Sequence, residues 1–201
     1  FFRLWSTDAN GDPDTTTRRV FLEAAGGYFY LGSTTDQQTG DWLIGELGSG
    51  DHVFVVMMNP LGGSIGTNYC GPANLNSTGM SGVISAVGSP FVADNFVDLT
   101  SSQLPANQIG YYITSQTKGF IPFPGGSQGS LCLSGSIGRY SKFVRSSGST
   151  GVITMSLDLT QTPQPSGLVS ILPGETWNWQ LWHRDKGGTN NFTDGISILF
   201  K

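Results

Sequence analysis

The segment DANGDPD at residues 8–14 places an oxygen-bearing side chain at every second position. Asp8, Asn10, Asp12 and Asp14 offer the hard oxygen ligands of which Ca²⁺ takes about six to eight. The EF-hand form of the pattern fails, because its glycine position is a proline and its closing carboxylate position is an arginine. We therefore predict a structural Ca²⁺ site completed by a distant carboxylate or by backbone carbonyls. A locally hydrogen-bonded Asx turn is the alternative.

Aromatic residues gather near the end of the chain, where Trp177, Trp179 and Trp182 share one short segment. Aromatic faces stack on the apolar faces of sugar rings, and neighbouring amides, carboxylates and guanidinium groups bond the hydroxyls. Strand alternation directs Trp177 and Trp179 to the core and Trp182 to the opposite face. Ordinary packing between strands is the alternative for Trp182. The predicted ligand-binding residues are Trp182, Arg184, Asp185, Asn191 and Asp194.

Two sequence patterns that are associated with catalysis are present, and each is incomplete. The string GGSQG at residues 125–129 fits the Gly-x-Ser-x-Gly motif of serine hydrolases, but that motif requires a helix after the serine, and LCL at residues 131–133 continues as strand. A glycosidase needs two neighbouring carboxylates, for which Glu175 beside the tryptophans is the residue to test. We predict no catalytic residues.

The chain has two cysteines, Cys70 and Cys132, with no further cysteine or histidine nearby at metal-ligand spacing. This arrangement favours a disulfide, and two buried free thiols are the alternative. Closing a loop of roughly 60 residues contributes about 4 kcal/mol in the chain-entropy model. A disulfide persists in oxidising compartments, so we expect the protein to be secreted, extracellular or held at a cell surface.

The composition excludes several classes of partner. Charged residues make up 12% of the 201 residues, the formal net charge is -4, and the ten Lys and Arg are scattered, which argues against binding nucleic acid. No run of about 18 apolar residues is present, so we expect no membrane insertion. The sequence begins at Phe1 rather than at a methionine, and we interpret it as a processed fragment or an excised module.

Short runs of period two dominate the chain and predict an all-β fold, an antiparallel β-sandwich of the jelly-roll kind. Breakers at residues 59–64 separate a predicted N-terminal β-segment, residues 1–63, from a disulfide-linked β-sandwich, residues 64–201. We expect the N-terminal segment to pack on the sandwich or to be continuous with it. The predicted strands are 19–23, 27–31, 52–58, 82–87, 95–99, 109–115, 131–137, 152–159, 177–183 and 195–200.

Several longer motifs carry a resemblance to a known kind of module. They are GTNYCGPA at 66–73, STG at 77–79, VADN at 92–95, LPANQ at 104–108, PGGSQG at 124–129, LCL at 131–133, IGRY at 137–140, GETWNWQ at 174–180 and NFTDG at 191–195. Together they resemble a C-terminal β-rich module of large exported or surface proteins from planctomycetes and other environmental bacteria. The resemblance covers about residues 66–201, implies an accessory or surface role, and brings no agreed activity.

These observations predict a non-catalytic extracellular module that binds polysaccharide or a cell-surface component. The alternative is a structural subunit of an extracellular fibre or surface layer that self-assembles through strand edges. A polysaccharide-degrading enzyme is the third choice. A binding module requires a solvent-facing aromatic with converging polar groups. A structural subunit requires an unpaired edge strand, and an enzyme requires a cleft with two acids.

Overall fold

The computed structural model describes residues 63–201 in full and, before them, the backbone of five strands. The chain divides into two compact units, Phe1–Met58 and Asn59–Lys201, which we call the first and second units. In the first unit, β1 (Phe2–Thr7) pairs with β2 (Pro13–Leu22). A separate antiparallel sheet has the order β3 (Gly32–Thr35), β4 (Trp42–Gly45), β5 (Val53–Val56).

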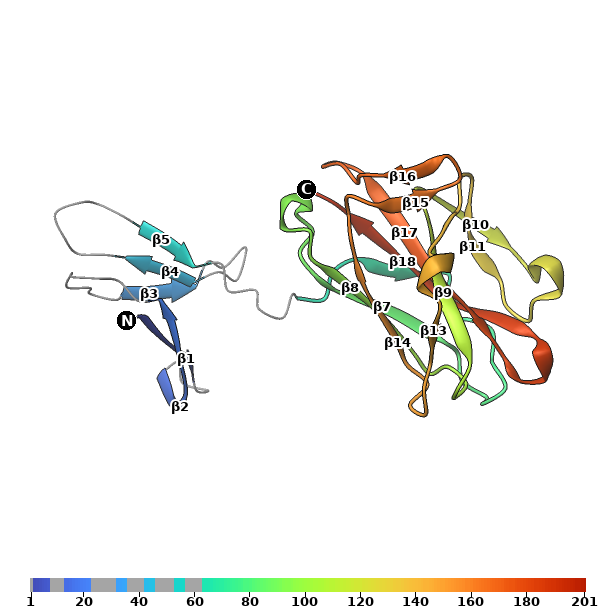
Figure 1. The fold of residues 1–201 in the computed structure, drawn as a ribbon, viewed down its shortest axis with the longest axis horizontal. Helices are drawn as coiled ribbons and strands as arrows, with labels where there is room; N and C mark the ends of the chain where they lie inside the picture. The colour runs from blue at the N-terminus through green and yellow to red at the C-terminus, as the bar shows by residue number, and fades with distance from the viewer. Residues whose placement is uncertain (1, 8–12, 23–31, 36–41, 46–52, 57–62) are drawn as a thin grey trace. The chain divides into compact units, whose positions relative to one another are not determined.

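The second unit is built on two antiparallel sheets (Figure 1). The large sheet has the order β12-β9-β17-β18-β6, with β13 also paired to β9, and the small sheet has the order β14-β8-β7. The large sheet contains β6 (Thr67–Tyr69), β9 (Ile109–Ser115), β12 (Gly138–Arg139), β13 (Arg145–Ser146), β17 (Thr176–Arg184) and β18 (Asn190–Leu199). The small sheet contains β7 (Val83–Gly88), β8 (Val97–Ser102) and β14 (Ile153–Leu157).

Two hairpins and four short 3-10 turns complete the second unit. The hairpins are β10 (Thr117–Ile121) with β11 (Leu131–Ser134), and β15 (Thr162–Gln164) with β16 (Gly167–Val169). The turns are η1 (Val92–Asp94), η2 (Pro124–Gly126), η3 (Ser141–Phe143) and η4 (Lys186–Gly188). The described residues contain no α-helix, so the fold is all-β, as the alternation of the sequence predicted.

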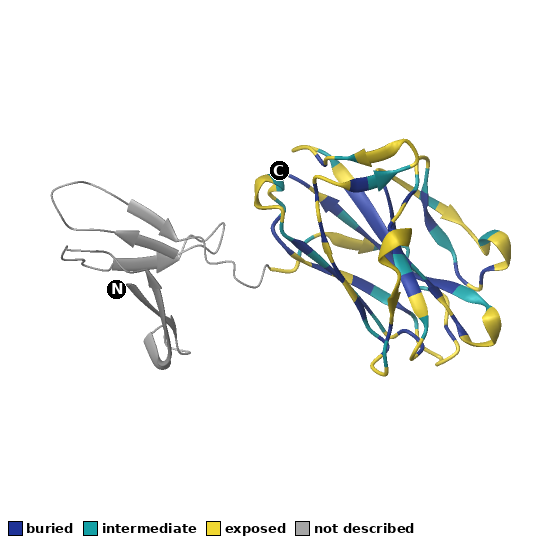
Figure 2. Ribbon diagram, viewed as in Figure 1, coloured by how far each residue is buried: buried dark blue, intermediate teal, exposed yellow. Residues whose placement is uncertain are grey.

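The main core lies between the two sheets, and the strands alternate across it (Figure 2). In β14, Ile153, Met155 and Leu157 are buried, whereas Thr154 and Ser156 are exposed. This is the pattern expected of a strand with one face in the core and one in water. Burying apolar surface at about 25 cal/mol per Å² is the main stabilising term of such a sandwich.

Two of the three tryptophans of β17 fill the centre of this core. Trp177 and Trp179 are almost wholly buried, with their ring centroids 6.4 Å apart, and Phe200 meets Trp179 edge to face at 6.1 Å. Tilted and edge-on ring pairs of this kind add to the stabilisation that comes from burial alone. The two tryptophans therefore serve the core, as their period-two spacing predicted.

The β10–β11 hairpin covers the other face of the large sheet. A second apolar cluster joins Ile113 and Phe192 of the sheet to Leu133 of the hairpin. A disulfide between Cys70 and Cys132 ties this hairpin to the segment that follows β6, with 6.3 Å between the two Cα atoms. The predicted disulfide is confirmed, and the large sheet is consequently buried on both faces where the hairpin lies.

Within the described part of the chain, no helix has the length and apolar character needed to cross a membrane.

Candidate functional site

Of the predicted ligand residues, Trp182 and Arg184 come together at the surface. Trp182 is partly exposed, and its ring lies 4.9 Å from that of Tyr111 on the neighbouring β9, tilted by 38°. The Arg184 guanidinium lies 5.3 Å from the centroid of the Trp182 ring, a cation–π distance. Trp182 is therefore engaged by two protein groups, and only part of its ring faces solvent.

Asp185 and Asn191 are buried, and both hold the loop that follows the disulfide. The Asp185 carboxylate accepts the backbone N–H of Ser77 at 3.0 Å and that of Lys186 at 2.7 Å. The Asn191 side-chain amide donates to the carbonyl of Leu75 at 3.1 Å. Their polar groups satisfy backbone groups that lie outside the named strands, and a hydrogen-bonded state of this kind is usual for buried polar side chains.

Asp194 links the two sheets. Its carboxylate accepts the backbone N–H of Ile84 in β7 at 2.8 Å and the side-chain amide of Asn68 in β6 at 2.9 Å. Burial raises the pKa of the Asp194 carboxyl, and these two hydrogen bonds oppose the rise. The structure thus brings Trp182 and Arg184 together and gives Asp185, Asn191 and Asp194 separate contacts with the backbone.

The predicted Ca²⁺ ligands fall in the first unit. Asp8, Asn10 and Asp12 lie outside the described residues, and Asp14 lies in β2, whose backbone alone is described. Calcium binding at this segment stays a prediction. Among the residues that the structure describes, no group of three or more His, Cys, Asp or Glu could hold a metal ion.

A groove opens where the edges of the two sheets meet. A hollow of about 600 Å³ lies between η3, β14 and the β15–β16 hairpin, and a second of about 580 Å³ lies over the outer face of the small sheet. Both are lined by Phe143, Met155 and Ser156, so they adjoin at Phe143. We call the two together the Phe143 groove. Each has the size of a small-ligand site.

The groove exists because an edge strand is interrupted. Arg139 of β12 pairs with Ile113 of β9, and Arg145 of β13 pairs with Gly110 of the same strand. Between these two short pairings the chain leaves β9 and forms η3, which carries Phe143 over β14. Interrupting an edge strand in this way also prevents a long exposed edge.

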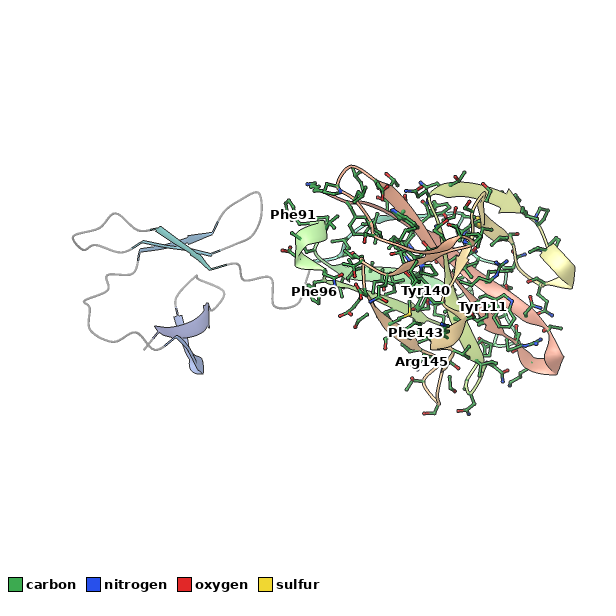
Figure 3. The ribbon with its side chains drawn as sticks, turned by 45° about the horizontal axis from the view of Figure 1, so that its top comes forward. Phe91, Phe96, Tyr111, Tyr140, Phe143 and Arg145 are labelled. Carbon is green, nitrogen blue, oxygen red and sulfur yellow. A yellow bond between two sulfur atoms is a disulfide. The ribbon has the colours of Figure 1, made fainter. Side chains whose placement is uncertain are left out.

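The ring of Phe143 is half exposed and is supported from behind. It is 50% exposed, and the buried Tyr140 ring meets it edge to face at a centroid distance of 6.4 Å and an interplanar angle of 61°. Figure 3 labels Tyr140, Phe143 and Arg145, which follow one another along this segment. Burial raises the pKa of Tyr140 to about 12, so its hydroxyl is neutral at physiological pH. Phe143 is an aromatic face held in place at a hollow surface.

Four polar side chains line the two hollows that meet at this ring. Thr100 and Thr154 line the second hollow, Gln164 lines the first, and Ser156 lines both. Within the described part of the chain, the hydroxyls and the amide of these four side chains make no hydrogen bond. Hydroxyl and amide groups donate and accept, so the groove offers a ligand hydrogen bonds of both senses beside an aromatic face.

A smaller hollow lies beside the disulfide. It measures about 390 Å³ and is lined by Phe120, Phe123, Phe192 and both cysteines. Phe120 is 68% exposed at the end of β10. Its walls are mostly rings, prolines and sulfur, and it is another place on this unit where aromatic side chains meet solvent.

The Phe143 groove lies outside the residues predicted from the sequence. The signal in the chain was the segment GRYSKFVR at residues 138–145, which holds three cations and two aromatics in a protein with only 12% charged residues. Comparison of the chain with models of known protein families, with curated proteins and with solved structures finds no match.

Proposed function

We propose that the second unit is a non-catalytic, extracellular β-sandwich module that binds polysaccharide in the Phe143 groove. The observation that carries the proposal is the half-exposed Phe143 ring at the junction of the two hollows. A ring in this position can stack on the apolar face of a sugar, and Thr154, Ser156 and Gln164 supply hydrogen bonds to its hydroxyls. Two adjoining hollows that share Phe143 suit a chain of sugars better than a single small molecule.

The disulfide supports the extracellular setting of the proposal, because such bonds persist in oxidising compartments. The resemblance to C-terminal modules of exported bacterial proteins points the same way, since such modules accompany larger front halves in accessory or surface roles. In this proposal the Trp182–Arg184 contact stabilises the outer face of the large sheet. The ligand binds elsewhere, at η3 and the Phe143 groove.

Binding of the full chain to a panel of plant, algal and bacterial polysaccharides in affinity gel electrophoresis tests the proposal. Phe143→Ala should weaken binding at least tenfold, about 1.4 kcal/mol. Phe120→Ala is the matched control, because it removes another exposed phenylalanine from the hollow beside the disulfide. Trp182→Ala should retain binding. Loss of binding in Trp182→Ala alone would move the site to that residue, and failure of the intact chain to bind any polysaccharide would refute the function.

One observation favours a second candidate, a structural subunit of an extracellular fibre or surface layer. β14 ends the small sheet, and among the described residues its strand partner is β8 alone. An exposed strand edge is a template for strand addition by another chain. Sedimentation velocity over a range of concentrations separates the candidates. The polysaccharide module stays monomeric, whereas a fibre subunit forms polymers that Thr154→Lys on β14 would suppress.

A further inference from the structure

The positive charge of the second unit is concentrated at the Phe143 groove. This unit has seven Lys and Arg residues, and three of them, Arg139, Lys142 and Arg145, fall within residues 138–145, which contain no acidic residue. Arg139 and Lys142 line the first hollow and Arg145 lines the second. The cations therefore border the same surface that presents Phe143.

These cations are not neutralised by the fold. Within the part of the chain that the structure describes, the side chains of Lys142 and Arg145 form no hydrogen bond and no ion pair. Arg139 makes one long hydrogen bond, 3.4 Å, to the carbonyl of Ile137. A guanidinium group can bind a carboxylate or a sulfate with two parallel hydrogen bonds, and an ammonium group binds the same anions as a point charge.

Two carboxylates also line the groove, and one of them is already engaged. Asp158 accepts hydrogen bonds from the backbone N–H and the hydroxyl of Thr160, and from the side-chain amides of Asn95 and Gln161. The Thr160 bonds are the main reason that the pKa of Asp158 is lowered. Its donors are neutral, so Asp158 keeps its charge, and with Asp98 in the second hollow the groove holds three cations and two carboxylates, a net charge of +1.

The backbones of the three cationic residues are spaced along the edge of the large sheet. Arg139 and Arg145 pair with residues of β9 that are three positions apart, Ile113 and Gly110, which corresponds to about 10 Å along the strand. Lys142 lies in η3 between them, beside Phe143. Cations distributed over two adjoining hollows complement a polymer that carries anions at intervals better than they complement a single compact anion.

From this arrangement we infer that the ligand of the Phe143 groove is a polyanionic polysaccharide, one whose sugars carry carboxylates or sulfates. The inference rests on the proposed function and names its ligand class. Phe143 contacts the sugar ring, while Arg139, Lys142 and Arg145 bind the anionic substituents. Because the cations are exposed, their contribution is large at low ionic strength and is screened by salt.

Matched pairs of polymers test the inference with the full chain. The pairs are dextran sulfate with dextran, and polygalacturonate with its methyl ester, so that the backbone stays constant and the charge changes. At about 50 mM salt the anionic member should bind at least tenfold more tightly in each pair that binds, and the preference should shrink at high salt. Comparing the two pairs distinguishes sulfate from carboxylate recognition.

Three variants test charge and stacking separately. The triple variant Arg139→Gln, Lys142→Gln, Arg145→Gln should lose the preference for the anionic member and keep any binding of the neutral member. Phe143→Ala should weaken both. Asp98→Asn should strengthen binding of the anionic member, because it removes the uncommitted acid of the groove. Melting temperatures of all variants check that each is folded.

The outcomes distinguish failure of the anionic ligand class from failure of polysaccharide binding as a whole. Equal binding of neutral and anionic members, or an unchanged preference in the triple variant, overturns the charge inference and leaves the proposed function standing. Failure of every polymer to bind overturns both. Residues 1–58 carry eight acidic and three basic residues, so a second copy of the chain is the competing partner for the cations. Self-association without polymer that the triple variant abolishes would assign the groove to a second copy of the chain and overturn the inference.

Discussion

The side-chain amide of Gln180 holds the backbone of Cys132, whose N–H donates to the Gln180 Oε1 at 2.9 Å. The Nε2 of the same side chain donates to the carbonyls of Ser130 at 3.0 Å and Thr193 at 2.7 Å. Gln180 is fully buried on β17. One residue of the large sheet therefore binds the overlying hairpin next to the disulfide.

Replacing Gln180 should destabilise the protein strongly. Gln180→Ala removes the partner of the buried Cys132 N–H, of the buried Thr193 carbonyl and of the part-buried Ser130 carbonyl, and each buried unsatisfied group costs about 1–3 kcal/mol. We expect the free energy of unfolding to fall by roughly 2–4 kcal/mol in urea denaturation. Gln128→Ala, at an exposed position, is the control and should change stability by less than about 0.5 kcal/mol. Equal effects of the two substitutions would contradict this role of Gln180.

Reducing the disulfide should lower stability by a similar amount. The Cys70–Cys132 bond closes a loop of 62 residues, for which chain entropy predicts about 4 kcal/mol. The Tyr69 hydroxyl donates to the Cys132 carbonyl at 3.0 Å, which keeps part of this junction in place without the bond. Urea denaturation of the oxidised protein and of the Cys70→Ser, Cys132→Ser variant measures the difference. Coincident midpoints would show that the bond does not stabilise the native state.

Stability should depend on the ionisation of Asp194. Burial raises the pKa of its carboxyl in the folded protein above the unfolded value of about 3.9. Between these two pKa values the folded state binds more protons, so the free energy of unfolding decreases as pH rises through this window. Asp194→Asn cannot ionise and should remove that decrease. The measurement is the difference in stability between the wild type and the variant at a series of pH values. A difference that is constant with pH would contradict the prediction.

The wall of the Phe143 groove should tolerate no side chain at Gly138. A Cβ added there would lie 1.7 Å from the carbonyl oxygen of Pro163, because β12 and β15 pack backbone against backbone. Gly138→Ala should therefore lower the melting temperature and weaken polysaccharide binding together, since the β15–β16 wall must move. Gly63→Ala is the control, because its Cβ would meet no atom within 4 Å. If Gly138→Ala melts and binds like the wild type, the β15–β16 hairpin accommodates the added methyl group, and the prediction is wrong.

Alternation predicted the sandwich and the inward faces of its strands, but not what lies on their outer faces. The alternation of β17 places Asn178 and Gln180 on the strand face opposite to that of the buried tryptophans, and alternation alone predicts that this face is exposed to solvent. Both are buried, because the β10–β11 hairpin, distant in sequence, covers that face. Trp182 shares this face and is likewise packed by Tyr111 from β9.

The candidate site could not be derived from local sequence for a related reason. Asp185 and Asp194 have the residue types of a ligand site, yet their partners are backbone groups about 110 positions away, which no local pattern reveals. The Phe143 groove depends on β12 and β13, two strands of two residues each, which are too short to show a period. Clustered cations and aromatics were its only local sign.

The most direct test of the central claim is a map of where a sugar polymer contacts the chain. We propose titrating the ¹⁵N-labelled protein with trigalacturonate and following the backbone amide shifts. Our account predicts that the shifts cluster at residues 139–145, 154–156 and 161–168 and saturate together. A cluster at Trp182 or around Phe120 and Phe123, with residues 139–145 unmoved, would contradict it.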